Sequence, residues 1–326
     1  MRVLVVKTSS LGDVIHALPA VSDAAAAVAD LRIDWVVERA FSEIPAWHPV
    51  VDRVIPCELR RWRKQPLQAL RSGEWAAFVD EMRRTRYDAI LDAQGLVKSA
   101  WLASRARGLR IGPGFRSARE PVAALFYQRR IDLPAHDQAH AVDRMRLLFS
   151  AALGYPLPDR APDFGLQRDQ FPMRDVAPRY AVLLHGTTWT NKRWPDQNWR
   201  ELGAWLKSKG VTGLLPWGND QERSSAENIA AAFDGVVLPR MRIGELAGLL
   251  AHANFVIGVD TGLAHLAGAL GTRCVTVYGP TLPALTGTVG ANQVHLVSEN
   301  DGTIRRDRPN SVTAAAVQEA LSPWLD

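Results

Sequence analysis

The segment KTSSLGDVIHALPA, residues 7–20, carries more polar side chains than a connection between two elements needs. It follows a short apolar run and leads into a helical pattern, where a glycine and a single helix cap would be enough. Asp13 can act as that cap. The surplus of hydroxyl and charged groups beside it favours a functional site, to which Ser9, Ser10 and Gly12 would contribute.

Three more polar clusters follow apolar runs in the second half of the sequence. Each cluster lies at the end of one of the apolar runs 180–186, 212–218 and 255–260. In that order, their sequences are HGTTWTNKRWP, GNDQE and DTGLAHLAG. The last cluster opens a helix whose free N–H groups and positive dipole end suit a phosphate. Hydroxyls and one lysine of the first cluster would help to hold a diphosphate without a metal ion. The residues assigned to this site are Thr187, Thr188, Lys192, Glu222, Asp260, Thr261, Gly262 and His265.

Several of these residues also have a common structural explanation. Asp260 would make a good N-cap at the end of a strand. Lys192 could be a solvated loop residue, and His265 a buried core histidine. Glu222 could simply occupy the first turn of a helix, where the dipole favours a carboxylate. Because all four follow strand ends of one domain, their joint placement favours a site.

An activated diphosphate compound in the second half would need an acceptor in the first half. Asp13 would then be a general base. One carboxylate suffices for an inverting displacement, because it only takes the proton from the attacking hydroxyl while the diphosphate leaves as a stabilised anion. Gly12 would allow close approach of the backbone, and Ser9 and Ser10 would orient the acceptor.

The second basic feature is the segment ELRRWRKQ, residues 58–65. Arginine forks bind phosphates and carboxylates through paired hydrogen bonds, so the segment suits an anionic lipid or a sugar acid. A solvated basic loop, or an unspecific patch for nucleic acid or a membrane surface, is the alternative. A single tryptophan is poor for stacking bases, and no nucleic-acid partner is expected. The acceptor-binding residues would be Arg60, Arg61, Arg63 and Lys64.

The charge balance agrees with an anionic partner for the first half. Up to residue 165 the sequence has 24 Lys and Arg against 19 Asp and Glu, and after it 15 of each. The net charge of +5 therefore lies in the first half, where it would concentrate an anion.

These clusters need elements that bring strand ends together. Apolar runs alternate with helical stretches in both halves, which predicts parallel sheets wrapped by helices. A proline-rich segment at 154–178 separates the halves. We therefore expect two α/β domains, 1–160 and 161–326, each Rossmann-like and doubly wound, facing a central cleft. Expected strands are 2–6, 33–38, 52–56, 87–92, 180–186, 212–218, 235–239, 255–260 and 274–279. Expected helices are about 14–29, 72–86, 96–107, 140–153, 196–209, 220–233, 243–253, 263–270 and 312–321, the last of which could pack back on the first domain.

Several common classes of site lack their sequence signatures. No G-x-G-x-x-G follows a strand, and no P-loop, D-x-D pair or G-x-S-x-G elbow occurs, so neither a cofactor nor a metal is expected. Cys57 and Cys274 lie far apart, without the spacing of a disulfide framework or a zinc site. No apolar run reaches the roughly 18 residues of a membrane-spanning helix, and no signal-peptide pattern opens the sequence. We therefore expect a cytoplasmic location.

With these features the sequence resembles the lipopolysaccharide heptosyltransferases of glycosyltransferase family 9, and within them the heptosyltransferase I type. The matching segments are MRVLVVKTSSLGDVIHALPAV, RRWRK, DAQGLVKSA, SAREP, HGTTW…KRWP, LPWG and VDTGLAHLAGALG…TVYGPT, from Met1 to about Thr281. The resemblance implies a GT-B fold, ADP-L-glycero-D-manno-heptose as donor and the Kdo region of Kdo2-lipid A as acceptor. It also implies a monomer in transient contact with the cytoplasmic face of the inner membrane.

The resemblance implies a role for each assigned residue. Asp13 would be the general base, and Glu222 would bind the ribose of the donor. Thr187, Thr188 and Lys192 would hold the donor diphosphate, with Asp260, Thr261, Gly262 and His265 near the diphosphate and the sugar, while Arg60, Arg61, Arg63 and Lys64 would bind the anionic acceptor.

One departure and two alternatives remain. The letters WTN, 189–191, stand where relatives are expected to carry an acidic residue. A heptosyltransferase II type that acts on an already heptosylated core would share the D-T-G-L-x-H segment. A two-lobed protein that binds a nucleotide or a polyanion without catalysis would share the predicted diphosphate site.

Overall fold

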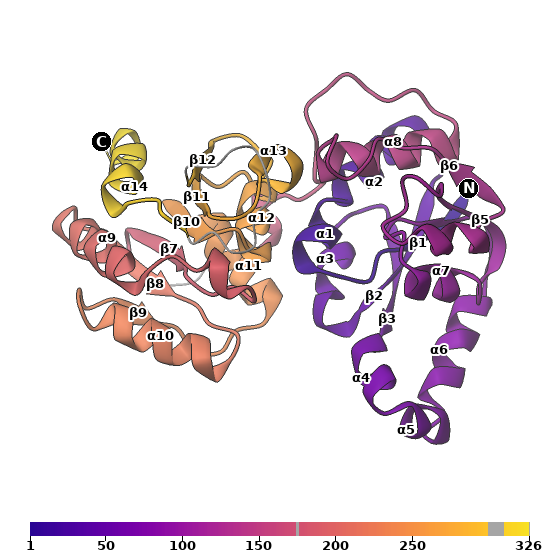
Figure 1. Cartoon of the computed structure of the whole chain (residues 1–326), viewed down its shortest axis with the longest axis horizontal. Helices are drawn as coiled ribbons and strands as arrows, with labels where there is room; N and C mark the ends of the chain where they lie inside the picture. Colours follow the sequence, from indigo (N-terminus) through magenta and orange to yellow (C-terminus); the bar gives the residue numbers. More distant parts are fainter. Residues whose placement is uncertain (174–175, 299–309, 326) are drawn as a thin grey trace. The chain divides into compact units, whose positions relative to one another are not determined.

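The computed structural model describes residues 1–173, 176–298 and 310–325. The chain divides into two compact units, Met1–Leu166 and Gln167–Asp326 (Figure 1). This division falls in the proline-rich segment in which the sequence placed its boundary. Each unit is built on one parallel sheet of six strands, with helices between successive strands.

The first sheet has the strand order β3-β2-β1-β4-β5-β6. Its central strands read as continuous apolar runs because helices cover both faces of a parallel sheet. All but the first residue of β1 are buried, as are four of the seven residues of β4 at its carboxyl end. The strands are β1 (Arg2–Val6), β2 (Arg32–Glu38), β3 (Val51–Cys57), β4 (Arg86–Asp92), β5 (Arg107–Pro113) and β6 (Arg129–Ile131).

Proline explains two helix boundaries in the first unit. The single helix expected near 14–29 is divided, because Pro19 has no N–H for the helix and its ring would clash with the carbonyl of residue 15. The basic segment 58–65 is a helix rather than a loop, and it ends before Pro66 with Gln65 in a non-helical conformation. The helices are α1 (Leu11–Ile15), α2 (Leu18–Ala27), α3 (Glu43–Ala46), α4 (Leu59–Lys64), α5 (Pro66–Arg71), α6 (Glu74–Arg83), α7 (Val97–Ala103) and α8 (Ala141–Leu153).

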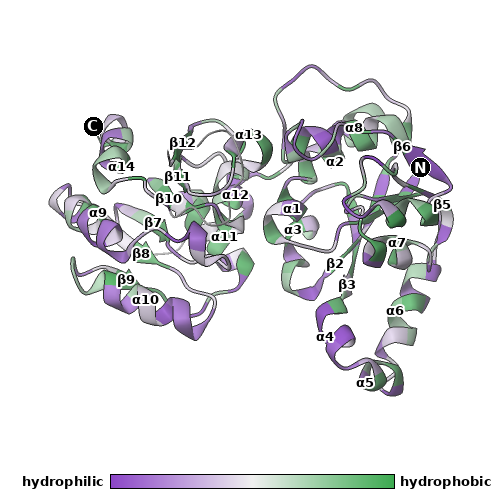
Figure 2. Ribbon diagram, in the orientation of Figure 1, coloured by the Kyte–Doolittle hydropathy of each residue, from purple (hydrophilic) through white to green (hydrophobic). Residues whose placement is uncertain are grey.

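The second sheet repeats the same topology, with the order β12-β11-β10-β7-β8-β9. The strands are β7 (Tyr180–Leu184), β8 (Thr212–Leu215), β9 (Val236–Val237), β10 (Phe255–Val259), β11 (Cys274–Tyr278) and β12 (Gln293–Val297). The helices are α9 (Asp196–Ser208), α10 (Asp220–Ala230), α11 (Ile243–His252), α12 (Gly262–Ala269), α13 (Pro283–Thr286) and α14 (Ala314–Leu321). Figure 2 shows that α12 is hydrophobic along most of its length, which agrees with its burial, whereas α10 is largely hydrophilic.

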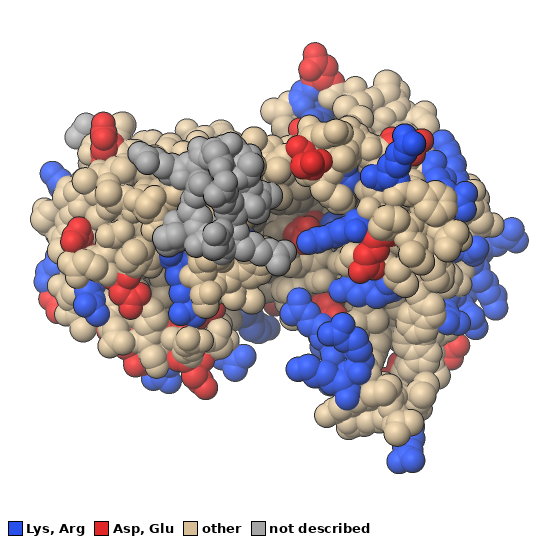
Figure 3. Space-filling view, viewed as in Figure 1, with Lys and Arg blue, Asp and Glu red and all other residues tan. Residues whose placement is uncertain are grey.

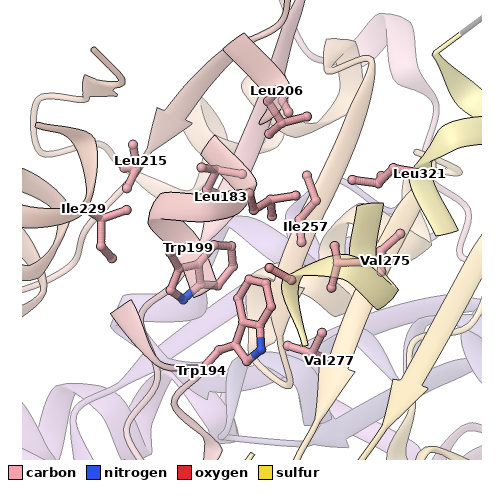
Figure 4. Close-up of a cluster of buried hydrophobic side chains, with 14 of the residues drawn as sticks. Leu183, Trp194, Trp199, Leu206, Leu215, Ile229, Ile257, Val275, Val277 and Leu321 are labelled. Carbon is pink, nitrogen blue, oxygen red and sulfur yellow. The ribbon is translucent and has the colours of Figure 1, made fainter. Parts of the chain in front are cut away.

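The core of the second unit joins its last helix to the sheet. Trp194 and Trp199 lie in one cluster with strand residues and with Leu321 of α14 (Figure 4). The indole N–H of Trp194 donates to the carbonyl of Val312, 2.6 Å away, just before that helix. Within the described residues α14 therefore packs against α9 and the sheet of its own unit.

Three strands of the structure were not expected from the sequence. β5 contains two arginines and two glycines, β6 has three residues, and β12 lies at a sheet edge with no fully buried residue. Their pairing with a neighbouring strand forms them, and no apolar run marks them in the sequence. In the part of the chain that the structure describes, no helix is long and apolar enough to cross a membrane.

Candidate active site

The two polar clusters lie at equivalent places in the two sheets. In each sheet the first strand of the unit lies in the middle, and the chain adds strands first on one side of it and then on the other. Ligands of such sheets bind beyond the carboxyl ends of the strands, where the order reverses. That point is β1/β4 in the first unit and β7/β10 in the second.

Asp13 lies directly after β1 and is held by the backbone around it. Ser10 is the N-cap of α1 and Asp13 the third helical residue, so the two form a capping box. The carboxylate oxygen Oδ2 accepts from the backbone N–H of Ser10 at 2.9 Å and from its hydroxyl at 2.7 Å. Gly12, in the same turn, is buried. Asp13 is thus part of the cap of α1, and the two hydrogen bonds from Ser10 fix the orientation of its carboxylate. The side chain is still partly exposed.

Lys7 supplies the charge opposite Asp13. Its ammonium lies 3.8 Å from the second carboxylate oxygen of Asp13, Oδ1, and donates to the carbonyl of Ala93 at 2.9 Å. Burial raises the pKa of Asp13, but the Lys7 charge and the Ser10 hydrogen bonds outweigh it and lower that pKa to about 2. Burial lowers the pKa of Lys7 in turn. Asp13 is therefore a carboxylate at neutral pH and can accept a proton.

The end of β4 fixes the loop that carries these residues. The Gln94 side-chain oxygen accepts from the Thr8 backbone N–H at 2.8 Å and from its hydroxyl at 2.7 Å. The amide of Gln94 donates to the carbonyl of Ser9 at 3.0 Å. The buried Asp92 accepts from the backbone of Gln94, which holds this residue in place. Neither Lys7 nor Gln94 was assigned a role from the sequence, although DAQG after a strand is a signal of the same kind as the others.

Cations surround the Asp13 cluster. Burial and, to a smaller extent, the nearby charges of Arg144, Arg119 and Lys7 together lower the pKa of His136 to about 4. The same arginines act on the pKa of Lys7. This end of the first sheet is thus electropositive and suits an anionic ligand.

Asp260 is the centre of the cluster in the second unit. Its buried Oδ2 accepts from the Lys192 ammonium at 2.6 Å and from the Thr281 hydroxyl at 2.7 Å. Its Oδ1 lies 3.4 Å from Nε2 of His265. Burial raises the pKa of Asp260, but His265 and Lys192 outweigh it, and the net effect lowers that pKa. Three side chains, which follow β7, β10 and β11, are thereby joined around one carboxylate.

The helix start beside Asp260 differs from one expectation. Asp260 is not the N-cap of α12. Thr261 has the extended backbone of that position, and Gly262 is the first helical residue. Asp260 is instead used to hold Lys192, which also lies 4.8 Å from the centre of the Trp189 ring. The N-terminus of α12 therefore comes directly after the carboxylate that holds Lys192, and a helix N-terminus with a cation held beside it suits phosphate.

Glu222 lies at the start of α10 and reaches back to β7. It is the third residue of that helix, as the dipole would favour, and its oxygen Oε2 accepts from the Gly218 N–H at 2.8 Å. A Cβ at Gly186 would lie 2.8 Å from the carboxyl carbon of Glu222. The imidazole of the buried His185 contacts the Glu222 carbonyl at 3.0 Å. The carboxylate is thus positioned beside the end of β7.

Thr187 and Thr188 follow β7 on a short connection that leads to Lys192. Thr187 is half-buried and Thr188 exposed, and among the described residues neither hydroxyl has a hydrogen-bond partner. Both hydroxyls can therefore donate to a ligand.

The basic helix α4 is attached to the Asp13 loop through Glu38. The backbone N–H of Glu38 donates to the Thr8 carbonyl at 3.0 Å, and its carboxylate accepts from the Arg60 N–H at 3.2 Å. Figure 3 shows Lys and Arg side chains gathered over the position of α4. The predicted cations are not equivalent, because Arg61 is paired with Glu58 and Glu74. No carboxylate within the described residues lies at ion-pair distance from the side chains of Arg60, Arg63 or Lys64.

Comparison with known proteins agrees with this geometry. The family model of glycosyltransferase family 9 (heptosyltransferase) matches residues 75–315. Lipopolysaccharide heptosyltransferase 1 of Pseudomonas aeruginosa is 50% identical over 301 residues, 92% of this chain and 84% of that protein. The solved E. coli heptosyltransferase WaaC with ADP is similar at a TM-score of 0.90 and 43% identity, over 99% of this chain and 100% of that one. WaaC with ADP-2-deoxy-2-fluoro heptose gives 0.87 and 43%, over 99% of both chains. The predicted pair of Rossmann-like domains of the GT-B kind is confirmed, and the chain belongs to glycosyltransferase family 9, the heptosyltransferases.

Proposed function

We propose that the chain transfers L-glycero-D-manno-heptose from ADP-heptose to the Kdo region of Kdo2-lipid A, with inversion at the anomeric carbon and without a metal ion. A 50% identical relative bears the name lipopolysaccharide heptosyltransferase 1, and a similar solved structure holds an ADP-heptose analogue. The proposal rests on two features that lie where the strand order of each sheet reverses. In the first unit this feature is the fixed carboxylate of Asp13, and in the second it is the fixed cation Lys192 beside the N-terminus of α12.

The second unit would bind the donor. Lys192 and the N–H groups at Thr261 and Gly262 would hold the diphosphate, with Thr187 and Thr188 donating further hydrogen bonds. Asp260 would orient Lys192, and His265 would lie near the diphosphate and sugar. Glu222, which stands beside β7 with its carboxylate aligned by Gly218, would accept from the ribose hydroxyls.

The first unit would bind the acceptor and remove its proton. Arg60, Arg63 and Lys64, with Arg61 in a supporting position, would bind the anionic groups, and Ser9 and Ser10 would orient the attacking sugar. The acceptor oxygen forms a bond to the anomeric carbon as the bond from that carbon to the diphosphate oxygen breaks. The hydroxyl proton passes to Asp13, and ADP leaves with its charge stabilised by Lys192.

A transfer assay with mass detection tests this function. The chain is incubated with ADP-heptose and, in parallel, with Kdo2-lipid A or the same lipid already carrying one heptose. We expect a mass increase of one heptose on the first acceptor, with an equal amount of ADP released and no effect of a chelator. Transfer to the heptosylated lipid alone would favour the heptosyltransferase II type, and intact ADP-heptose with tight ADP binding would favour a binding protein.

The acceptor would also determine where the protein acts. We propose a monomer that contacts the cytoplasmic face of the inner membrane transiently, because the acceptor is a membrane lipid and the cationic excess lies in the first unit. Flotation with anionic vesicles at low and high salt checks this proposal, with binding expected at low salt only.

A further inference from the structure

The first unit contains an apolar cavity whose aromatic and aliphatic walls have no role in the site described above. It has a volume of about 530 Å³ and lies between α4, α5, α6 and α7. Its walls include the side chains of Trp62, Trp75, Trp101, Leu59 and Leu70. Cavities of this volume with aromatic and aliphatic walls commonly bind small molecules.

The aromatic walls of this cavity are fixed by contacts with one another. The rings of Trp75 and Trp101 stack with their centres 4.8 Å apart, and Trp62 meets Trp75 edge-on at 5.7 Å. The indole N–H of Trp62 donates to Glu74 at 3.1 Å. Since that N–H is already bonded, Trp62 offers mainly hydrocarbon surface to the cavity.

Cations stand at the edge of the same cavity. Arg60, Arg63 and Lys98 all contribute to its lining. A second cavity of about 520 Å³ shares Arg63, Lys98 and Trp101 with the first, so the two adjoin at these side chains. Glu38 lies near enough to Lys98 to interact with its charge, and Glu120 lines the second cavity, but no carboxylate of the described residues is at ion-pair distance from Arg63 or Lys98. An apolar space next to two such cations is complementary to an amphiphile with an anionic group.

We propose that this cavity binds an acyl chain of the anionic lipid acceptor, with an anionic group of the same lipid between Arg63 and Lys98. The identity of the lipid rests on the proposed function, whereas the chemical class follows from the cavity and its cations. Each methylene removed from water raises the affinity about fourfold. The cavity thus provides affinity for the lipid part of the acceptor.

Helix α5 offers a matched pair of variants for the test. Leu67 and Leu70 are 67% and 61% exposed, but only Leu70 lines the cavity. Leu70→Asp places a carboxylate at the wall of the cavity, and Leu67→Asp makes the same change on the same helix outside it. Because both side chains are exposed, both variants should fold.

The first measurement is direct binding, which needs no transfer activity. Dodecyl phosphate is titrated into the full chain, and the fluorescence of the wall tryptophans reports occupancy. We expect saturable binding that weakens with shorter alkyl chains, falls roughly tenfold or more in Leu70→Asp and is unchanged in Leu67→Asp. Equal affinity for dodecyl and butyl phosphate, or equal effects of the two variants, would overturn the proposal.

The second measurement tests whether the acyl chain that the cavity binds belongs to the acceptor. Transfer is compared with Kdo2-lipid A and with the same acceptor stripped of all acyl chains. We expect Leu70→Asp to raise KM for the acylated acceptor with little change in kcat, and to leave the stripped acceptor unaffected. If Leu70→Asp weakens binding to anionic vesicles but not KM, the cavity serves a bilayer lipid and the proposal fails. Absence of transfer in every variant would contradict the proposed function, while the dodecyl phosphate titration still decides the cavity's ligand class.

Discussion

The contact between Lys7 and Asp13 determines the protonation of the proposed base. Without the Lys7 charge, less opposes the effect of burial on Asp13, and its pKa rises from about 2 toward the ordinary value. A carboxylate must be ionised to accept a proton. Because the raised pKa leaves less of Asp13 ionised at low pH, kcat/KM of Lys7→Met should fall there. The measurement is kcat/KM between about pH 4 and pH 8.

The expected wild-type profile has no acid limb from Asp13 in this range, whereas that of Lys7→Met declines as the pH falls. Lys7→Arg restores the charge and should restore the flat profile. If all three profiles coincide, the charge of Lys7 does not control Asp13.

Lys192 should account for much of the affinity for the donor. A hydrogen bond to a charged group contributes about 1.5–3 kcal/mol, so Lys192→Ala should weaken ADP binding roughly 10- to 100-fold in calorimetry. Lys207→Ala is the control, because Lys207 also pairs with an aspartate in the second unit but does so on the surface. Comparable losses in the two variants would show that Lys192 has no special role.

At the scale of elements, the junction of β7 with α10 positions Glu222. A Cβ at Gly186 would force the Glu222 carboxylate away from the Gly218 N–H. Gly186→Ala should therefore raise the Kd of ADP roughly tenfold, since one charged hydrogen bond to the ribose is lost. Binding of inorganic pyrophosphate should not change.

The pyrophosphate titration separates the ribose contact from damage to the diphosphate site. A parallel loss of both ligands would contradict the role of Glu222. The melting temperature of Gly186→Ala checks the fold, and only a small shift is expected because the contact involves the end of a flexible side chain.

Particular elements show what the sequence could predict. β1, β4, β7 and β10 were predictable because strands buried on both faces read as apolar runs, and these strands carry the site at their ends. The helix start at Thr261 and Gly262 was predictable because a polar segment with a threonine and a glycine directly follows the apolar run of β10. β5 and β6 were not, since their positions depend on pairing with a neighbour rather than on their own residues.

Sequence reasoning could identify single residues of the two clusters but not the contacts between them. Their position after an expected strand indicated Asp13, Lys192 and Asp260 as site residues, but it did not indicate which side chains are in contact. The contact of Lys192 with Asp260 spans 68 residues, and Gln94 meets Thr8 across 86. Such pairs become visible only when the order of the strands is known.

For the whole molecule, the uneven charge of the two units should give the binding of the two substrates a different dependence on salt. The excess of cations lies in the first unit, while the second is balanced. Added salt screens exposed charges over about 8–10 Å, so it should raise KM for the acceptor several-fold more than KM for ADP-heptose. Initial rates at increasing ionic strength measure both. An equal rise for both substrates would remove the assignment of the acceptor to the first unit.

The proposed function requires Asp13 to remove the acceptor's proton during heptosyl transfer, and single-turnover kinetics of Asp13→Asn test this role. Asparagine keeps the size and an acceptor oxygen but cannot take the proton. We expect transfer from ADP-heptose to Kdo2-lipid A to slow roughly 10²- to 10⁴-fold, while the Kd of ADP stays the same. A variant that transfers heptose at nearly the wild-type rate, with its fold intact by circular dichroism, would contradict it.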